Sequence, residues 1–145
     1  MGLFGSLDIS ASALSAERLR MDVTAENLAN AQSTRTAGGG PYRRKEVVLQ
    51  QSGGGFAGAL APAPSADGPN GGVKVSGIVE DTAPDRLVYD PGHPDANQQG
   101  YVRMPNVNPV TEMVDLISAS RSYEANVTAM QTSKQMFTKT LDLLR

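Results

Sequence analysis

Residues 109–145 read PVTEMVDLISASRSYEANVTAMQTSKQMFTKTLDLLR, and their pattern indicates the architecture of the chain. Asn108 and Pro109 mark a helix start, because asparagine caps a helix and proline fits its first position. No further glycine or proline interrupts the segment before Arg145. One set of side chains recurs at alternating steps of three and four residues, which is typical of a coiled-coil seam: Met113, Leu116, Ser120, Tyr123, Val127, Met130, Lys134, Phe137, Leu141 and Leu144. The pattern predicts one helix on the order of 50 Å long, at ~1.5 Å per residue.

A second stripe lies near the N-terminus and repeats every seven residues, at Leu7, Leu14, Met21 and Leu28. The segment from about residue 6 to residue 33 is rich in good helix formers and predicts a second long helix. Because the chain must leave this helix and return through an insert, we expect the two helices to pair as an antiparallel coiled coil. The apolar and tyrosine members of both stripes are the predicted helix and subunit interface. Other apolar residues lie off the seam and need neighbouring chains to cover them: Ile9, Leu19, Val23, Val114, Ile117, Met136 and Leu143.

Between the two stripes the chain is rich in helix breakers. All nine prolines fall between Pro41 and Pro109, and thirteen of the fifteen glycines fall between Gly38 and Gly100. Strands are predicted at residues 42–50, 73–80 and 86–89. The last two are expected to pair as a hairpin around residues 81–85, with the strand near Val47 as a candidate third member. Residues 51–72 are expected to form a flexible loop. The predicted fold is therefore mainly α with a small β-hairpin and loop-rich insert, divided into a first helix (1–35), an insert (36–106) and a last helix (107–145).

Composition excludes several classes of function. The formal net charge is −2, which gives no overall field for binding nucleic acid or an anionic membrane. The chain has no cysteine and a single histidine, so it offers neither thiol chemistry nor an evident nucleophile–base pair. Aromatic residues make up 5%, and we expect no large core in the insert. No run of apolar residues is long enough for a membrane span, and no cofactor site is expected.

Each of three short motifs has a functional interpretation and a purely structural one. The basic run Arg43, Arg44 and Lys45 could bind nucleic acid, but it fits the solvated edge of a strand better. His93 with Asp90 and Asp95 could bind a metal ion, but these residue types also build turns. The segment 1–6 matches a myristoylation pattern and equally fits a lead-in to the first helix. Neither a basic n-region nor an apolar h-region precedes the first helix, so no cleavable secretory signal is expected.

Several motifs together resemble a known family. Asn27-Leu28-Ala29-Asn30 followed by Tyr42-Arg43-Arg44 is similar to the N-terminal signature of the bacterial flagellar rod, hook and hook-associated proteins. The segments 89–97, 100–102, 104–107 and 113–126 resemble the proximal-rod branch of this family. The positions that carry the resemblance are Asn27, Asn30, Tyr42, Arg43, Asn106, Ser118, Arg121, Tyr123 and Asn126.

The resemblance implies a structural, non-enzymatic subunit of the rod, the drive shaft that carries torque from the motor to the hook. It implies a place in the flagellar basal body across the periplasm, reached through the type III export route without a cleavable signal. The implied partners are copies of the same chain and other rod proteins, with motor-ring and export-gate components as neighbours. Neither nucleic acid nor insertion into a membrane is implied. The alternative, from the helical pattern alone, is a soluble adaptor or export-associated protein that binds partner helices.

Overall fold

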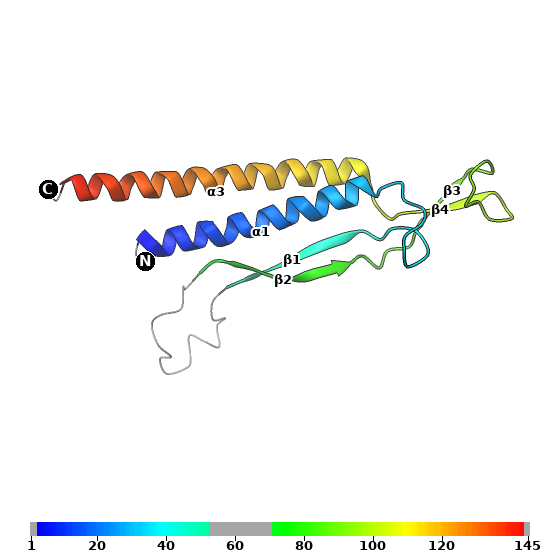
Figure 1. Cartoon of the computed structure of the whole chain (residues 1–145), viewed down its shortest axis with the longest axis horizontal. Helices are drawn as coiled ribbons and strands as arrows, with labels where there is room; N and C mark the ends of the chain where they lie inside the picture. The colour runs from blue at the N-terminus through cyan, green and yellow to red at the C-terminus, as the bar shows by residue number, and fades with distance from the viewer. Residues whose placement is uncertain (1–2, 53–70, 144–145) are drawn as a thin grey trace, which may run out of the picture. The chain divides into compact units, whose positions relative to one another are not determined.

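A computed structural model describes residues 3–52 and 71–143, and its fold is mainly helical (Figure 1). The helices and strands follow in the order α1 (Leu3–Ala29), β1 (Lys45–Gln51), β2 (Val73–Glu80), β3 (Arg86–Tyr89), β4 (Tyr101–Met104) and α3 (Pro109–Leu143). The expected mainly α fold with a small β insert is confirmed. Most of the predicted loop at 51–72, together with Leu144, lies outside the described residues.

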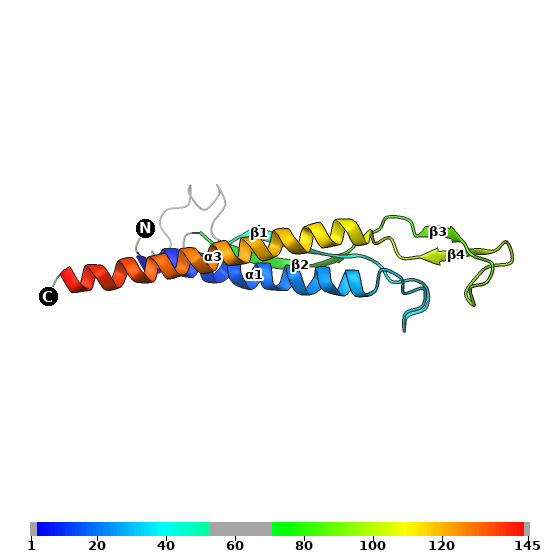
Figure 2. The ribbon, with the colours of Figure 1, turned by 90° about the horizontal axis from the view of Figure 1, so that it is seen from above.

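The chain divides into two compact units, and both long helices contribute to each. The terminal unit comprises Met1–Leu19, Val48–Gly77 and Ala119–Arg145, and the junction unit comprises Arg20–Val47 and Ile78–Ser118. In the terminal unit, the start of β2 is joined to α1, since the Val73 N–H donates to Ser12 Oγ at 3.1 Å. In the junction unit, the last turns of α1 lie beside the first turns of α3 in both views (Figures 1 and 2).

Asparagine side chains lie at the start of α3 and at the end of α1. α3 begins at Pro109 as predicted, and the Asn108 side chain caps it by accepting the Val110 N–H at 3.1 Å. α1 ends at Ala29, a few residues before the expected end at 32–35. At this end the Asn30 backbone N–H and its side-chain amide both donate to the Glu26 carbonyl, at 3.0 and 2.9 Å.

The strands form two separate pairs, β1 with β2 and β3 with β4. The Ser52 N–H donates to the Gly72 carbonyl and the Asp81 N–H donates to the Arg44 carbonyl, both at 2.8 Å, so β1 and β2 run antiparallel. The predicted hairpin between 73–80 and 86–89 is wrong. Residues 81–85 do not close a turn between these strands, and Pro84 within them has no N–H for a ladder bond.

The partner of β3 is β4, a strand that the sequence reading missed. Its register pairs Arg86 with Met104, Leu87 with Arg103, Val88 with Val102 and Tyr89 with Tyr101. Gly100 makes the return possible, because its φ is +82° and an added Cβ would lie 2.8 Å from the Tyr89 ring. The Asn97 side chain also accepts the Tyr101 N–H at 2.8 Å. The turn chemistry at 90–100 therefore selects this pairing.

The buried sides of the helices differ from the predicted seams. In α1, Ala16 and Val23 are buried, and neither belongs to the predicted stripe. Val23 was expected to need a neighbouring chain, but it is only 5% exposed. The predicted interface residues of α1 are half-buried: Leu7, Leu14, Met21 and Leu28.

In α3 the inward positions in the first turns are Glu112 and Ala119, whereas Met113 is 45% exposed. The side of α3 that faces inward is set by a charged residue, Glu112, whose partners lie elsewhere in the chain. A three-four pattern of apolar residues therefore does not predict which side is buried. Among the predicted interface residues of α3, the half-buried ones are Leu116, Tyr123, Val127 and Met130. The exposed ones, besides Met113, are Phe137 and Leu141.

Candidate functional site

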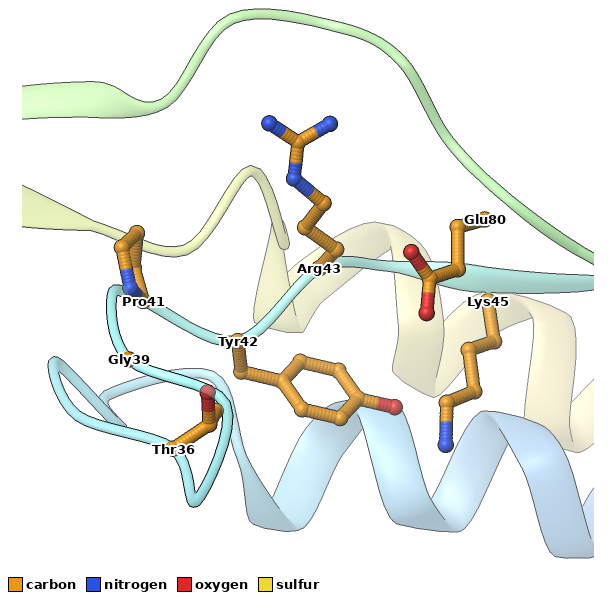
Figure 3. A pocket seen from close by; sticks show the side chains of 7 residues that line it. All are labelled: Thr36, Gly39, Pro41, Tyr42, Arg43, Lys45 and Glu80. Carbon is orange, nitrogen blue, oxygen red and sulfur yellow. The ribbon is translucent and has the colours of Figure 1, made fainter.

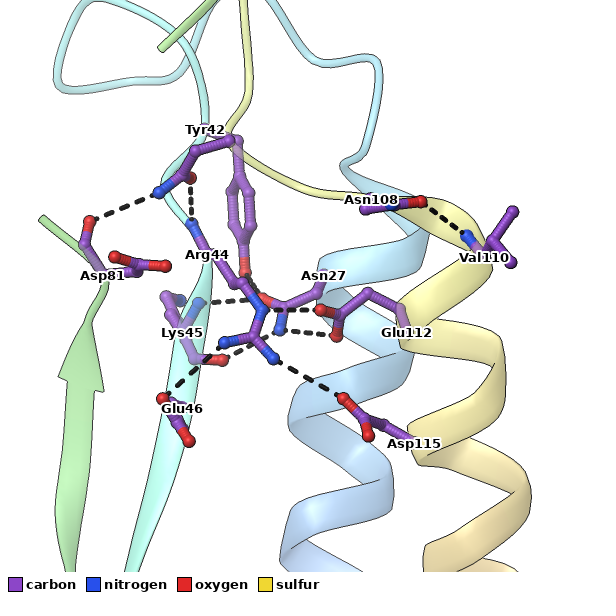
Figure 4. A network of polar contacts seen from close by, with 11 residues as sticks. Asn27, Tyr42, Arg44, Lys45, Glu46, Asp81, Asn108, Val110, Glu112 and Asp115 are labelled. Atoms are coloured by element: carbon purple, nitrogen blue, oxygen red, sulfur yellow. Dashed lines mark hydrogen bonds and ion pairs between the residues drawn. The ribbon is translucent and has the colours of Figure 1, made fainter. Parts of the chain in front are cut away.

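A polar cluster, here called the polar junction, holds the end of α1, the start of β1 and the start of α3 together (Figure 4). It comprises Asn27, Tyr42, Arg44, Lys45, Asn106 and Glu112. All six residues belong to the junction unit.

The loop after α1 turns the chain through Gly39 and Gly40, which have φ of +80° and +88°. Such angles are strained for residues with a Cβ, so glycine is required there. The Tyr42 N–H donates to the Ser33 carbonyl at 3.0 Å and closes the loop. Tyr42 is thereby placed against Ala31 and Val107, with which it forms a small buried cluster.

Asn27 is the centre of the junction and is only 1% exposed. Its Oδ1 accepts the Tyr42 hydroxyl and the Lys45 N–H, each at 2.9 Å. Its Nδ2 donates to the Lys45 carbonyl at 2.8 Å and to Glu112 Oε2 at 3.0 Å. Both donors and both acceptor positions of the amide are therefore used, and α1 is fixed to β1 and to α3 by one side chain.

Glu112 is a buried carboxylate with a paired charge. It is 1% exposed, and its Oε1 accepts from Arg44 Nε at 2.6 Å. The hydrogen bond to Glu112 raises the pKa of the Arg44 guanidinium above its ordinary value. Arg44 also lies 3.6 Å from Glu46 and from Asp115, so its charge is shared among three carboxylates. A buried ion pair of this kind is costly to break, because the remaining charge is left without a partner.

Asn106 and Tyr42 complete the junction from the two sides. Asn106 Oδ1 accepts the Arg44 N–H at 2.9 Å, which fixes the segment before α3 to the start of β1. Burial raises the pKa of the Tyr42 hydroxyl, and the nearby Glu26 carboxylate adds to the effect. Lys45 donates to Glu26 at 2.7 Å, and this hydrogen bond raises the pKa of the Lys45 ammonium.

A second link joins the loop after α1 to the turn between β3 and β4. Asp95 accepts the Thr34 hydroxyl at 2.8 Å and forms an ion pair with Arg35. The hydrogen bond from Thr34 lowers the pKa of Asp95, and the Arg35 charge contributes further. His93 Nδ1 accepts the Asp95 N–H at 3.1 Å.

The three residues of the candidate metal site, His93, Asp90 and Asp95, instead take part in hydrogen bonds of this turn. Asp90 accepts the Gly92 N–H at 3.1 Å. Within residues 3–52 and 71–143, no group of three or more histidine, aspartate or glutamate side chains is placed to hold a metal ion.

Two pockets flank the loop at 36–41. One of about 380 Å³ is lined by Thr36, Gly39, Pro41, Tyr42, Arg43, Lys45 and Glu80 (Figure 3). Arg43 points away from the Tyr42 ring in this view, so the basic run does not converge on one ligand. The other, of about 270 Å³, is lined by Thr34, Arg35, Gly40, Pro41, Asp95, Asn97, Tyr101 and Arg103. Residues of the loop at 36–41 therefore line both pockets.

The structure brings together three of the positions that carried the family resemblance, namely Asn27, Tyr42 and Asn106. Asn30 donates to the Glu26 carbonyl at the end of α1, whereas Arg43 and Ser118 are exposed. The other three positions belong to the terminal unit. There Arg121 is exposed, Tyr123 is half-buried, and Asn126 donates to the Ser122 carbonyl at 2.8 Å.

Sequence reasoning missed Arg44 and Glu112 as functional residues. Arg44 belongs to the basic run and to the Tyr42-Arg43-Arg44 motif, but neither marks it as buried; it follows Tyr42 by two residues and therefore shares its face of an extended chain. No sequence signal marks Glu112 as buried, because acidic residues are ordinarily found exposed in the first turn of a helix.

Comparison with known proteins decides the family. The family model described as "Flagella basal body rod protein" matches residues 7–35, and the model of the C-terminal region of flagellar basal body rod FlgEFG proteins matches residues 98–143. The flagellar basal-body rod protein FlgC of Bacillus subtilis is 53% identical over 99% of both chains. FlgC of Borreliella burgdorferi is 44% identical, and FlgC of Escherichia coli O157:H7 is 50% identical, over nearly the full length of each chain.

The chain belongs to the FlgC family of flagellar basal-body rod proteins. Members of the FlgC family are structural proteins and not enzymes, so the polar junction is a structural site. Among the described residues, no helix has an apolar stretch that could cross a membrane. In this FlgC-family chain the N-terminal family model covers Asn27 and Asn30, and the C-terminal model covers Asn106 and Glu112.

Proposed function

We propose that the chain is a structural subunit of the proximal flagellar rod, and that it polymerises through its terminal helices into the shaft that carries torque from motor to hook. Full-length similarity to FlgC proteins of three distant bacteria is the observation that carries the proposal. The polar junction gives it a physical basis, because a shaft needs subunits whose helices keep a fixed geometry under load.

Polymerisation through the helices is supported by apolar residues that the chain itself leaves uncovered. In α3, Met136 is 52% exposed, Leu141 is 51% exposed and Leu143 is 87% exposed. Exposed apolar side chains in such numbers on one helix indicate a surface that another chain covers. We propose that the half-buried residues of both seams pair as an antiparallel coiled coil and that the exposed ones contact neighbouring subunits.

The proposed partners are further copies of this chain and other rod proteins, with motor-ring and export-gate components as end neighbours. The helical segments 1–35 and 107–145 form the polymerising core in this proposal, and residues 36–106 form the part that is turned outward. The net charge of −2 is consistent with contacts made by packing rather than by a strong electrostatic field.

Complementation tests the proposal directly. The chain, carrying an affinity tag, is expressed in Bacillus subtilis that lacks its own FlgC, and swimming and the composition of purified basal bodies are measured. We expect motility to return and the tagged chain to be recovered in the rod. Stable expression without motility and without the chain in basal bodies would contradict the proposed function.

A further inference from the structure

The start of α3 carries an exposed apolar face that the chain does not cover. Val110 is 66% exposed, Val114 is 60% exposed and Ile117 is 54% exposed. With Met113, these residues are spaced three and four apart and share one side of the helix. This group is here called the α3 stripe. Beyond it the same side becomes polar, at Arg121, Thr128 and Thr132, so the apolar face is confined to the first two turns.

A second exposed apolar face lies on the β3–β4 ribbon. Leu87 is 62% exposed, Tyr89 is 64% exposed and Tyr101 is 43% exposed. They alternate with Val88 and the fully buried Val102, and therefore lie on one side of the ribbon. The rings of Tyr89 and Tyr101 pack edge to face with centroids 5.3 Å apart. This side of the ribbon, with Leu87, Tyr89 and Tyr101, is here called the ribbon face.

The two faces cannot meet within one chain. Only residues 105–108 join β4 to α3, and these are held in place. Pro105 and Val107 are buried, and Asn106 accepts the Arg44 N–H. The ribbon therefore extends beyond the first turn of α3, as both views show (Figures 1 and 2). Each face remains exposed until another chain covers it.

We propose that the ribbon face of one copy docks on the α3 stripe of a second copy. The inference rests on the proposed function and names one contact within the assembly. The ribbon face fits within the length of the stripe, since the two steps from Leu87 to Tyr89 span about 7 Å and the seven steps from Val110 to Ile117 span about 10 Å. The two faces match in chemistry as well, because tyrosine rings and leucine pack on β-branched side chains and on the Met113 thioether.

The charges also fit contact between two copies. The α3 stripe contains no charged residue, and Arg103, which lies opposite Leu87 on the same side of the ribbon, pairs with Asp85 at 3.3 Å. Docking the two faces therefore buries no unpaired charge. Because the contact joins two different surfaces, a single contact leaves one ribbon and one stripe free, and further copies can add there unless the rotation between copies closes a ring.

Cysteine cross-linking tests the contact, since the natural chain has no cysteine. Leu87→Cys and Val114→Cys are placed in one tagged chain, which is expressed in the Bacillus subtilis strain that lacks FlgC. Purified basal bodies are treated with a short bismaleimide. We expect a ladder of dimers and larger multiples from the double variant, whereas each single variant gives only monomer. The control pairs Leu87→Cys with Thr128→Cys, in the polar part of the same side of α3, and should give no ladder.

Three outcomes would overturn the inference. A motile strain whose double variant gives no ladder would remove the contact but leave the proposed function in place. Dimers from Val114→Cys alone would show that two stripes meet each other instead. A cross-linked band at the monomer size would place the ribbon on its own helix. If the wild-type chain neither restores motility nor enters basal bodies, the proposed function fails first.

Discussion

At the residue scale, Asn27 shows how much geometry one uncharged side chain can fix. Its amide copies the hydrogen-bonding pattern of a backbone peptide toward Lys45, and its remaining positions bind Tyr42 and Glu112. An aspartate in its place would direct a carboxylate oxygen at the Lys45 carbonyl and at the Glu112 carboxylate. Two acceptors would then face each other without water.

We therefore expect Asn27→Asp to lower the free energy of unfolding by about 3–5 kcal/mol, the cost of a buried charge without a partner. Urea unfolding followed by circular dichroism measures this difference. Asn126→Asp is the matched control, because its amide only donates to the carbonyl one turn earlier in α3. An equal loss of stability in both variants would contradict the central role of Asn27.

Arg44 and Glu112 allow a second test at this scale. Arg44→Met should destabilise the wild-type chain by about 3–5 kcal/mol, since it leaves the buried Glu112 carboxylate unpaired. The same change should cost clearly less in a Glu112→Gln background, where the remaining group is neutral and can still accept from Asn27. A double-mutant cycle by urea unfolding measures the coupling. Additive effects would show that the pair does not act as a unit.

Sequence reasoning reached part of this site. Asn27, Tyr42 and Asn106 stood out through the family resemblance, although their common location did not follow from it. Glu112 did not stand out, because its burial depends on partners that are 68 and 85 positions away in the chain. Spacing along a helix predicts which residues share a side, but it contains no information on a distant arginine.

At the element scale, Asp95 is the link between the loop after α1 and the β3–β4 turn. Its pKa is lowered in the folded chain, chiefly by the Thr34 hydrogen bond and then by Arg35. The link therefore stabilises the fold above the unfolded pKa of about 3.9, and this contribution is lost as the pH falls through the lower folded value.

Asp95→Asn should accordingly be less sensitive to acid than the wild-type chain. We expect the stability difference between the two proteins to be largest near neutral pH and to shrink below about pH 4. Urea midpoints measured from pH 7 downward test this. Glu124→Gln, at an exposed position of α3, serves as the control and should show no such convergence. A difference that stays constant with pH would contradict the role of the carboxylate.

The strands show where element prediction succeeds and where it stops. Residues 73–80 and 86–89 are strands with the predicted bounds, because β-branched and aromatic residues favour them. Their pairing was predicted wrongly, because it depends on the turn at 90–100 and on Gly100. The short strand β4 was missed, since its four residues make too weak a pattern by themselves.

At the scale of the whole molecule, assembly should be separable from folding. Leu141 is 51% exposed, so Leu141→Asp should leave the circular dichroism of the purified chain unchanged. In the proposed rod the same charge would enter a packed interface at roughly several kcal/mol per unpaired ion. We expect the combined variant Leu141→Asp and Leu144→Asp to be exported, absent from basal bodies and non-motile. Thr132→Asp is the matched control on an exposed polar part of α3 and should remain motile.

The helical stripes led to the fold class from sequence, but not to the buried register. The seam pattern assumes that apolar residues alone choose the inward side. Here a buried ion pair places Glu112 inward and leaves Met113 on the outside. The α3 stripe follows from this shift, since the residues that surround Met113 are carried outward with it.

The separation of the junction partners along the chain also has a kinetic consequence. Asn27 and Glu112 are 85 positions apart, so a chain that is synthesised from its N-terminus holds an incomplete junction until most of its length is available. Contacts over such separations are slow to form, because a large loop must close first. The Lys45 amide hydrogen, which Asn27 binds, should therefore gain protection from solvent exchange in the last phase of refolding, and in a chain truncated before Glu112 it should gain none.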